Sequence, residues 1–289
     1  MATYSYDEKT NREDLTDIVT NISPTETPLV SMFGKTKANA TYHEFVEDEL
    51  KPAKANAHVE GEDITAHEVP SRVRKGNYTQ IIEEDYKVTE TQQAVNTAGV
   101  KDEYAYNAYK AMKQFSKDLE YALVNNTEAK AGSKTEARQM AGVPGIVKTN
   151  ILTAASITGK VIGDALQAAW EQGGEPTKLV VSGANKRAVS AMTTSNTKTV
   201  AAKDKTLTEA VDVYDTDFGR IEIVASRFMP SDTAFVLDPS YFKVAWLRNV
   251  HKADLPKLGD SKAGYIIGEC TLEGKAEKAS AIIKIGAGK

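Results

Sequence analysis

The spacing of hydrophobic positions changes several times along the chain, and each change marks a different expected element. The longest regular stretch covers residues 99–130, where apolar side chains recur every three or four positions. The members of this stripe are Val100, Tyr104, Ala108, Met112, Phe115, Leu119 and Leu123. The pattern predicts one amphipathic helix that ends near Gly132 and spans roughly 40 Å. It is far longer than the average helix of about 11–12 residues.

Residues 1–36 carry a short helical pattern that prolines interrupt. Leu15, Ile18, Val19 and Ile22 predict a helix from about Asn11 to Asn21, and Pro24 and Pro28 prevent its continuation. An apolar patch follows, formed by Leu29, Val30, Met32 and Phe33. We therefore expect an N-terminal arm, and the pattern leaves open whether it packs on its own domain or on a neighbouring subunit.

Residues 37–92 predict two strands separated by a long connection. The strands are Thr41–Leu50 and Gly76–Glu90, both rich in Tyr, Thr, Val and Ile. The polar connection of about 25 residues is unusual inside a compact domain. Because a two-stranded ribbon is marginally stable alone, we expect this region to protrude and to complete its structure on another surface. A flexible surface excursion is the alternative.

Residues 143–237 alternate between helical and strand patterns. One helical face consists of Val161, Ile162, Leu166, Ala169 and Trp170, and Gly173-Gly174 is its expected end. A buried strand at 178–182 precedes a helix at 184–192 and a polar loop at 193–208. Strands at 211–214 and 220–224 flank turn residues and predict a hairpin, and a further strand covers 233–237.

The C-terminal residues 240–289 are rich in strand patterns. Tyr241–Leu247 alternates between apolar and polar positions. Two more strands, Tyr265–Leu272 and Ala279–Ile285, flank the charged segment 273–278. This arrangement predicts that the last two strands pair as a closing hairpin.

Composition excludes several classes of protein. The 289 residues include 41% hydrophobic and 26% charged side chains, which is a globular balance rather than a disordered one. Thirty-six basic residues against 40 acidic ones give a net charge of −4, which argues against a sequence-reading nucleic-acid binder. The single cysteine forms no intrachain disulfide, and we find no signal peptide or membrane-spanning run, so we expect a soluble protein made in a cytosol.

Motifs of catalysis and of metal or cofactor binding are missing from the sequence. The four histidines (His43, His58, His67 and His251) are scattered, and neither CxxC nor a phosphate-binding loop occurs. Cys270 lies in an apolar strand, where a free cysteine is usually a small buried side chain. The turn Ser182–Asn185 is explained by the residues that begin the following helix. An α/β enzyme or small-ligand binder with a pocket at this turn remains an alternative. We predict no catalytic, cofactor-binding or metal-binding residues.

Charges of both signs gather on the expected protrusion. Its strands carry the acids Glu44, Glu47, Asp48, Glu49, Glu83, Glu84 and Asp85. The connection and its flank carry the bases Lys51, Lys54, Arg72, Arg74 and Lys75. If the two strands pair, like charges come close within one chain, which is unfavourable. We therefore predict inter-subunit contacts in which bases of one copy meet acids of the next.

Three motifs, together with the order of the elements, carry a resemblance to a known family. Asp14-Leu-Thr-Asp-Ile-Val-Thr-Asn-Ile-Ser-Pro-Thr-Glu-Thr-Pro-Leu29 lies near the start of the chain, and Val143-Pro-Gly-Ile146 precedes the central region. Trp170-Glu-Gln-Gly-Gly-Glu-Pro176 precedes the strand Leu179–Gly183. Over nearly its whole length the chain resembles the major capsid proteins of tailed bacteriophages, which have the HK97 fold.

The resemblance implies an α+β fold of named parts. Residues 1–36 correspond to the N-terminal arm and 37–92 to the extended β-hairpin loop, or E-loop. Residues 93–142 correspond to the peripheral domain with its long spine helix, 143–237 to the axial α/β domain, and 238–289 to the return of the peripheral β-sheet.

The resemblance also implies a function. Pentamers and hexamers of such a protein form the icosahedral shell around phage double-stranded DNA, without sequence-specific DNA binding, cofactor or membrane. Because the arm begins at Met1, we expect a separate scaffolding protein, with a portal and decoration proteins as further partners. The expected location is the virion, after assembly in the host cytoplasm. An encapsulin-like compartment shares the fold and is an alternative.

Overall fold

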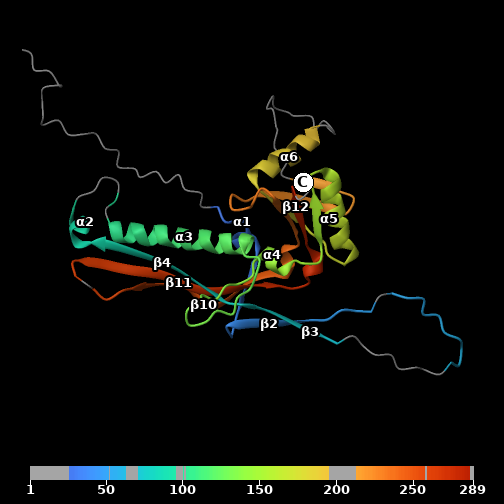
Figure 1. Ribbon diagram of the computed structural model, residues 1–289, viewed down its shortest axis with the longest axis horizontal. Coiled ribbons are helices and arrows are strands. Elements are labelled where there is room, and N and C mark those ends of the chain that lie inside the picture. The colour runs from blue at the N-terminus through green and yellow to red at the C-terminus, as the bar shows by residue number, and fades with distance from the viewer. Residues whose placement is uncertain are drawn as a thin grey trace, which may run out of the picture. The chain divides into compact units, whose positions relative to one another are not determined.

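The computed structural model describes residues 26–51, 53–62, 71–95, 100, 102–194, 213–257 and 259–286 (Figure 1). The predicted helix over 11–21 and most of the 193–208 loop lie outside these residues. The chain divides into two compact units. Among the described residues, one unit contains Glu83–Phe115 and His251–Ile267, and the other contains Glu26–Ile82, Ser116–Val250 and 268–286.

A six-stranded sheet forms the largest part of the second unit. Its strand order is β5-β12-β9-β6-β8-β7. The strands are β5 (Ile151–Ala154), β6 (Lys178–Val181), β7 (Val213–Thr216), β8 (Gly219–Ala225), β9 (Thr233–Leu237) and β12 (Ala281–Ile285). Helices α5 (Gly159–Glu171) and α6 (Gly183–Thr194) pack against it. The predicted alternation of helices and strands is therefore confirmed, as is the hairpin of β7 and β8, which pair antiparallel.

The apolar face of α5 explains why this helix packs on the sheet. Ile162, Leu166 and Ala169 are fully buried, whereas Trp170, which we expected on the same face, is 57% exposed. Gly173 has φ +83°, and its N–H donates to Trp170 O while Gly174 N–H donates to Ala169 O. This is the Schellman arrangement that ends a helix. The expected glycine stop is confirmed.

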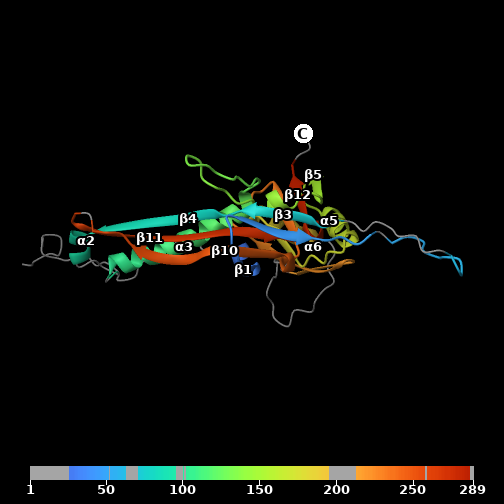
Figure 2. The same ribbon diagram turned by 90° about the horizontal axis from the view of Figure 1, so that it is seen from below.

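A four-stranded sheet has the order β1-β10-β11-β4, and Figures 1 and 2 both show β4, β10 and β11 side by side. Its strands are β1 (Gly34–Lys37), β4 (Gln80–Thr89), β10 (Phe242–Asp254) and β11 (Ser261–Gly274). Short helices α2 (Glu90–Ala94), α4 (Val143–Ile146), η1 (Pro239–Tyr241) and η2 (Glu277–Ala279) lie in the connections. The predicted closing hairpin is wrong, because β11 pairs within this sheet while β12 pairs with β5 and β9.

The long helix α3 (Glu103–Asn125) exists but is shorter than predicted, with 23 residues. Tyr104, Phe115, Leu119 and Leu123 are buried as the stripe requires, whereas Met112 is 42% exposed. The chain leaves the helix at Asn126, whose side-chain amide donates to Met140 O and Gln80 Oε1. Gly132, with φ +72°, lies instead in the turn that the Lys130–Gln139 bridge closes.

The start of the described chain packs on its own subunit. Leu29 lies in helix α1 (Pro28–Met32), Phe33 is the C-cap of that helix, and both side chains are buried. The Phe33 ring stacks on Phe242, with ring centroids 5.2 Å apart. The Glu120 carboxylate accepts hydrogen bonds from Leu29 N at 3.1 Å and Val30 N at 2.9 Å. Burial raises the pKa of Glu120, although these two bonds oppose the rise. The apolar patch therefore belongs to its own chain.

Candidate assembly interface

The protruding region contains a ribbon of two antiparallel strands, β2 (Tyr42–Glu47) and β3 (Val73–Tyr78). The prediction that 41–50 pairs with 76–90 is wrong, because the second segment is split. Thr79 separates β3 from β4, and its N–H donates to Thr41 O while its hydroxyl donates to Glu269. Register alternation places His43, Phe45 and Glu47 on one face of the ribbon.

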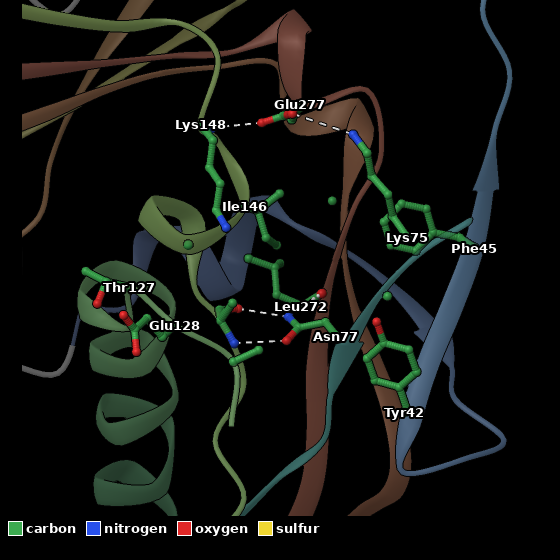
Figure 3. A pocket seen from close by; sticks show the side chains of 15 residues that line it. Tyr42, Phe45, Lys75, Asn77, Thr127, Glu128, Ile146, Lys148, Leu272 and Glu277 are labelled. Carbon is green, nitrogen blue, oxygen red and sulfur yellow. Dashed lines mark hydrogen bonds and ion pairs between the residues drawn. The ribbon is translucent and has the colours of Figure 1, made fainter. Parts of the chain in front are cut away.

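Asn77 fixes the inner end of the ribbon to the body of the second unit. Its side-chain amide donates to Ala141 O and Leu272 O, both at 2.9 Å, and its oxygen accepts from Ala141 N at 2.9 Å (Figure 3). Asn77 itself is only 3% exposed. Buried side-chain hydrogen bonds of this kind define a unique geometry, because breaking them leaves polar groups unsatisfied.

Gly76 lies beside this attachment and lets two tyrosines pair over it. A Cβ at Gly76 would lie 2.8 Å from the Tyr42 ring and 2.8 Å from His43 O. The rings of Tyr42 and Tyr78 lie with centroids 4.6 Å apart. A larger residue at position 76 would therefore displace Tyr42.

Further out, charged groups connect the ribbon to the turn between β11 and β12. Lys75 Nζ lies 2.8 Å from Glu47 Oε2 and 3.5 Å from Glu277 Oε1. Glu47 also accepts from Ala276 N at 2.9 Å, and Lys278 Nζ donates to Glu49 at 2.6 Å. Burial alone would lower the pKa of Lys75, but the bonds and charges of Glu47 and Glu277 raise it above its usual value.

Glu273 forms a second charged group at the same turn. His43 Nε2 donates to Glu273 Oε2 at 2.6 Å, and Lys275 Nζ lies 2.8 Å from Glu273 Oε1. Burial raises the pKa of Glu273, yet the hydrogen bonds from Lys275 and His43 outweigh it and hold the pKa below its ordinary value. This carboxylate is therefore ionised at neutral pH.

A cavity of about 540 Å³ lies under the ribbon (Figure 3). Phe45 and Lys75 line it from the ribbon, Leu272 and Ile146 supply apolar wall, and Lys148 and Glu128 bring charges of opposite sign. The Glu277 carboxylate accepts from Lys148 N at 2.7 Å. The cavity is therefore bordered by both the charged turn and the apolar body.

The structure corrects our view of the charges on the protrusion. Arg72 pairs with Asp48 at 3.2 Å and Arg74 with Glu44 at 3.7 Å, so both arginines have acidic partners within the chain. The expectation that pairing brings like charges together is wrong, because Arg74 and Lys75 lie opposite Val46 and Phe45 and reach the nearby acids Glu44 and Glu47. Glu83, Glu84 and Asp85 lie on β4, outside the ribbon, and Lys51 and Lys54 are exposed beyond β2. Contact with a neighbouring copy stays a prediction for Lys51, Lys54, Arg72, Arg74, Lys75, Glu44, Asp48, Glu83, Glu84 and Asp85.

Sequence reasoning missed Glu269, the most highly connected buried carboxylate near the ribbon. Its Oε1 accepts from Thr79 at 2.7 Å and Arg138 at 2.6 Å, and its Oε2 accepts from Arg248 at 2.9 Å. Glu269 is 4% exposed. The available signal was a single acid inside the apolar run Ile266-Ile267-Gly268-Glu269-Cys270.

The residues weighed for chemistry have structural roles. Ser182 Oγ accepts from Asn185 N at 3.4 Å and so caps the N-terminus of α6. The side-chain amide of Asn185 donates to Ser231 O. Cys270 is fully buried, and burial raises its pKa to about 12. Within the described ranges, no three His, Cys, Asp or Glu side chains gather as metal ligands. None of the described helices has the length and apolarity to cross a membrane.

Comparison with known proteins finds that the sequence of this chain is similar to major capsid proteins of phages. The family model described as SU10 major capsid protein matches residues 2–286. The major capsid protein of Escherichia phage Phieco32 is 33% identical over 122 residues, which is 42% of this chain and 35% of that protein. The chain thus matches about a third of the length of that relative.

Solved structures share the fold at low sequence identity. The capsid of cyanophage A-1(L) superposes with TM-score 0.70 at 13% identity, covering 98% of this chain and 100% of the other. Mycobacterium phage Adephagia gives TM-score 0.63 at 13% identity, covering 99% and 98%. The holo-SrpI encapsulin complex from Synechococcus elongatus PCC 7942 gives TM-score 0.63 at 10% identity, covering 98% and 96%.

Proposed function

The chain belongs to the SU10 major capsid protein family, and we propose that copies of it assemble into the icosahedral shell that encloses phage double-stranded DNA. The observation that carries this proposal is the family match over residues 2–286, nearly the whole chain. The expected α+β, HK97-like fold is confirmed by likeness to phage capsid structures. Members of the family are structural proteins and not enzymes, so the alternative of an α/β enzyme is wrong.

We further propose the division of labour that the family resemblance implies. The six-stranded sheet with α5 and α6 supports an axial domain over 143–237. Helix α3 supports a spine helix within 93–142, and β10 and β11 support a peripheral return over 238–274. The return does not extend to 289 as expected, because β12 pairs with β5 and β9 in the six-stranded sheet. The ribbon supports an E-loop within 37–92, although β4 (Gln80–Thr89) belongs instead to the four-stranded sheet, and residues 1–36 remain as the N-terminal arm.

The proposal includes the partners of such a shell. The chain forms hexamers and pentamers of itself, with a separate scaffolding protein, a portal and decoration proteins. Assembly takes place in the host cytoplasm, and the product is the virion capsid. A net charge of −4 supports a container that holds DNA without binding particular sequences.

A protein compartment without a genome is the second candidate function. The encapsulin neighbour, with TM-score 0.63, shows that this fold also builds such compartments. The two candidates differ in what the particle encloses, because one holds nucleic acid and the other holds protein cargo.

Electron microscopy of the purified chain tests the proposal. Negative-stain images at high concentration, with scaffolding protein added where needed, are expected to show closed shells or tubes. Particles isolated from infected cells are expected to contain DNA that nuclease cannot reach. A chain that stays strictly monomeric under all conditions would contradict the proposal. Particles that contain protein cargo instead of nuclease-resistant DNA would favour the second candidate.

Reversing charges on the ribbon tests the predicted inter-subunit contacts. Arg72→Glu and Arg74→Glu together are expected to block shell formation while the melting temperature of the chain changes little. Lys75 is left unaltered in this variant, because it pairs with Glu47 and Glu277 of its own chain. Exposed pairs contribute only about 0–1 kcal/mol each, but the same contact repeats throughout a shell. Light scattering during assembly across a salt series measures the effect, with circular dichroism as the folding control. Added salt is expected to weaken wild-type association, since such charges are screened beyond about 8–10 Å.

A charge swap separates contact with a neighbour from pairing within the chain. Glu44→Arg with Arg74→Glu, combined with Asp48→Arg and Arg72→Glu, keeps both cross-strand pairs and inverts the outward charges. This variant is expected to fold and to remain unassembled. Normal assembly by the swapped variant would show that these charges act only within the ribbon.

A further inference from the structure

We propose that the ribbon β2–β3 is a lever with a fixed hinge at Asn77 and a releasable ionic latch, formed by Glu47, Glu49 and Lys75 with the turn residues 276–278. The structure shows the latched position. The importance of this device for shell assembly rests on the proposed function, whereas the device itself belongs to the isolated chain.

Buried, neutral hydrogen bonds form the hinge, and beside them His43, the register partner of Asn77, contacts the Glu273 carboxylate at 2.6 Å. Three of the hinge bonds join Asn77 to Ala141 and Leu272, each at 2.9 Å. Thr79 N–H adds a bond to Thr41 O at 2.8 Å. Salt does not screen such bonds, and breaking them leaves buried polar groups unsatisfied. This end of the ribbon is therefore fixed to the body.

The latch differs from the hinge in its chemistry and in its position. Glu47 lies four residues beyond His43, the register partner of Asn77, which corresponds to about 13 Å along a strand. Its contacts are charged: Lys75 Nζ at 2.8 Å, the Ala276 N–H at 2.9 Å, and Lys278 to the neighbouring Glu49 at 2.6 Å. Partly exposed ionic contacts weaken in salt and are made and broken one by one.

The cavity of about 540 Å³ lies between these two attachments. Phe45 and Lys75 face this space. This space separates Phe45 from the apolar wall of Ile146 and Leu272, so the close packing typical of a protein interior does not hold the ribbon at this point. The ionic contacts of the latch therefore contribute strongly to holding the ribbon in its observed orientation.

The turn that receives the ribbon is itself strained. Ala276 has φ +48°, the only positive φ of a non-glycine residue in the described part of the chain. Left-handed backbone is disfavoured for residues with a Cβ and persists where surrounding contacts enforce it. Glu47 accepts from the N–H of this same residue, so the docked ribbon and the strained turn stabilise each other. Release of one favours relaxation of the other.

A shell of pentamers and hexamers places one sequence in several environments. A lever with a fixed hinge and an ionic latch gives the ribbon more than one direction while its strand register stays intact. Release of the latch by a neighbouring charge would then adapt the ribbon to its site in the shell.

Spin-label distances in the unassembled full-length chain test the device. The labels are attached through Leu50→Cys, three residues beyond the end of β2 and 97% exposed, and Tyr121→Cys, 57% exposed on α3, while the buried Cys270 does not react. With the latch intact, we expect one narrow distance distribution. Glu47→Ala or Lys75→Met is expected to broaden it and shift its mean, and high salt is expected to do the same to the otherwise unaltered chain.

Arg74→Met is the matched control, because Arg74 pairs with Glu44 inside the ribbon and contacts no turn residue within the described part of the chain. This variant is expected to keep the narrow distribution. Hydrogen exchange gives an independent measure: the segment 273–278 is expected to exchange roughly tenfold faster in Glu47→Ala, with the segment around Ala141 unchanged.

Either of two results would overturn the proposal. One is a distribution that stays narrow in both latch variants and in high salt, and the other is equal broadening in Arg74→Met. Since the measurement uses unassembled chains, its failure is distinct from a failure of shell formation, which electron microscopy reports separately.

Discussion

Phe115→Ala is expected to lower the free energy of unfolding by about 3–5 kcal/mol, the usual cost of truncating a buried phenylalanine. Phe115 is 2% exposed in the middle of α3, in the same stripe as Leu119 and Leu123, which are 2% and 0% exposed. Domains have a total stability of only about 5–15 kcal/mol. The variant is therefore expected to be insoluble or strongly destabilised, as measured by soluble yield and by chemical denaturation followed with circular dichroism.

Tyr109→Ala is the matched control for this prediction. It removes an aromatic side chain from the same helix at a position that is 57% exposed, so its effect is expected to stay within about 1 kcal/mol. Normal melting of Phe115→Ala with loss of assembly alone would mean that Phe115 contacts a neighbouring subunit, and our assignment of the stripe to the core would then be wrong.

Glu269→Leu is expected to destabilise the chain by about 3 kcal/mol, because removing one member of a buried ionic cluster leaves the others uncompensated. Arg138, Arg248 and Thr79 would all lose their shared acceptor. The two arginine side chains are 27% and 44% exposed, and hydration of these groups keeps the cost at the lower end of the range for buried pairs. Denaturant unfolding measures the loss.

Limited proteolysis shows where Glu269→Leu acts. Arg138 belongs to the segment 130–139, which the Lys130–Gln139 bridge closes, and this segment is expected to become the first site of cleavage. Glu222→Ala is the control, because Glu222 forms its pair with Lys178 at a side chain that is 53% exposed. Equal stability of Glu269→Leu and Glu222→Ala would contradict a stabilising role for the cluster.

Elements that depend on neighbours in the sequence could be predicted. The strand predicted at 233–237 is β9, Thr233–Leu237, with four of its five residues buried. Helix α5 and its glycine end follow from an apolar stripe and a local Schellman turn, both of which are set within a few residues. The motifs near residues 14–29, 143–146 and 170–176 led to the capsid family, which the family match over 2–286 confirms.

Strand pairing could not be predicted in this way. An alternating pattern identifies a strand but does not identify its partner. The run from Val73 to Thr89 reads as strand almost throughout, yet Thr79 divides it between the ribbon and the four-stranded sheet through bonds to Thr41 and Glu269. In the same way, β12 follows β11 in the chain but pairs with β5 and β9.

The charged residues show most clearly what the sequence determines and what the tertiary structure determines. By itself, the sequence determined the kinds of elements, their order, the family and the concentration of acids and bases on one protrusion. Only the tertiary structure decided that Arg72 and Arg74 meet Asp48 and Glu44, and that Glu47 reaches Ala276 across 229 residues of chain. Helices and turns depend on contacts within a few residues, whereas strand register and ion pairs depend on which distant segments the folded chain brings together.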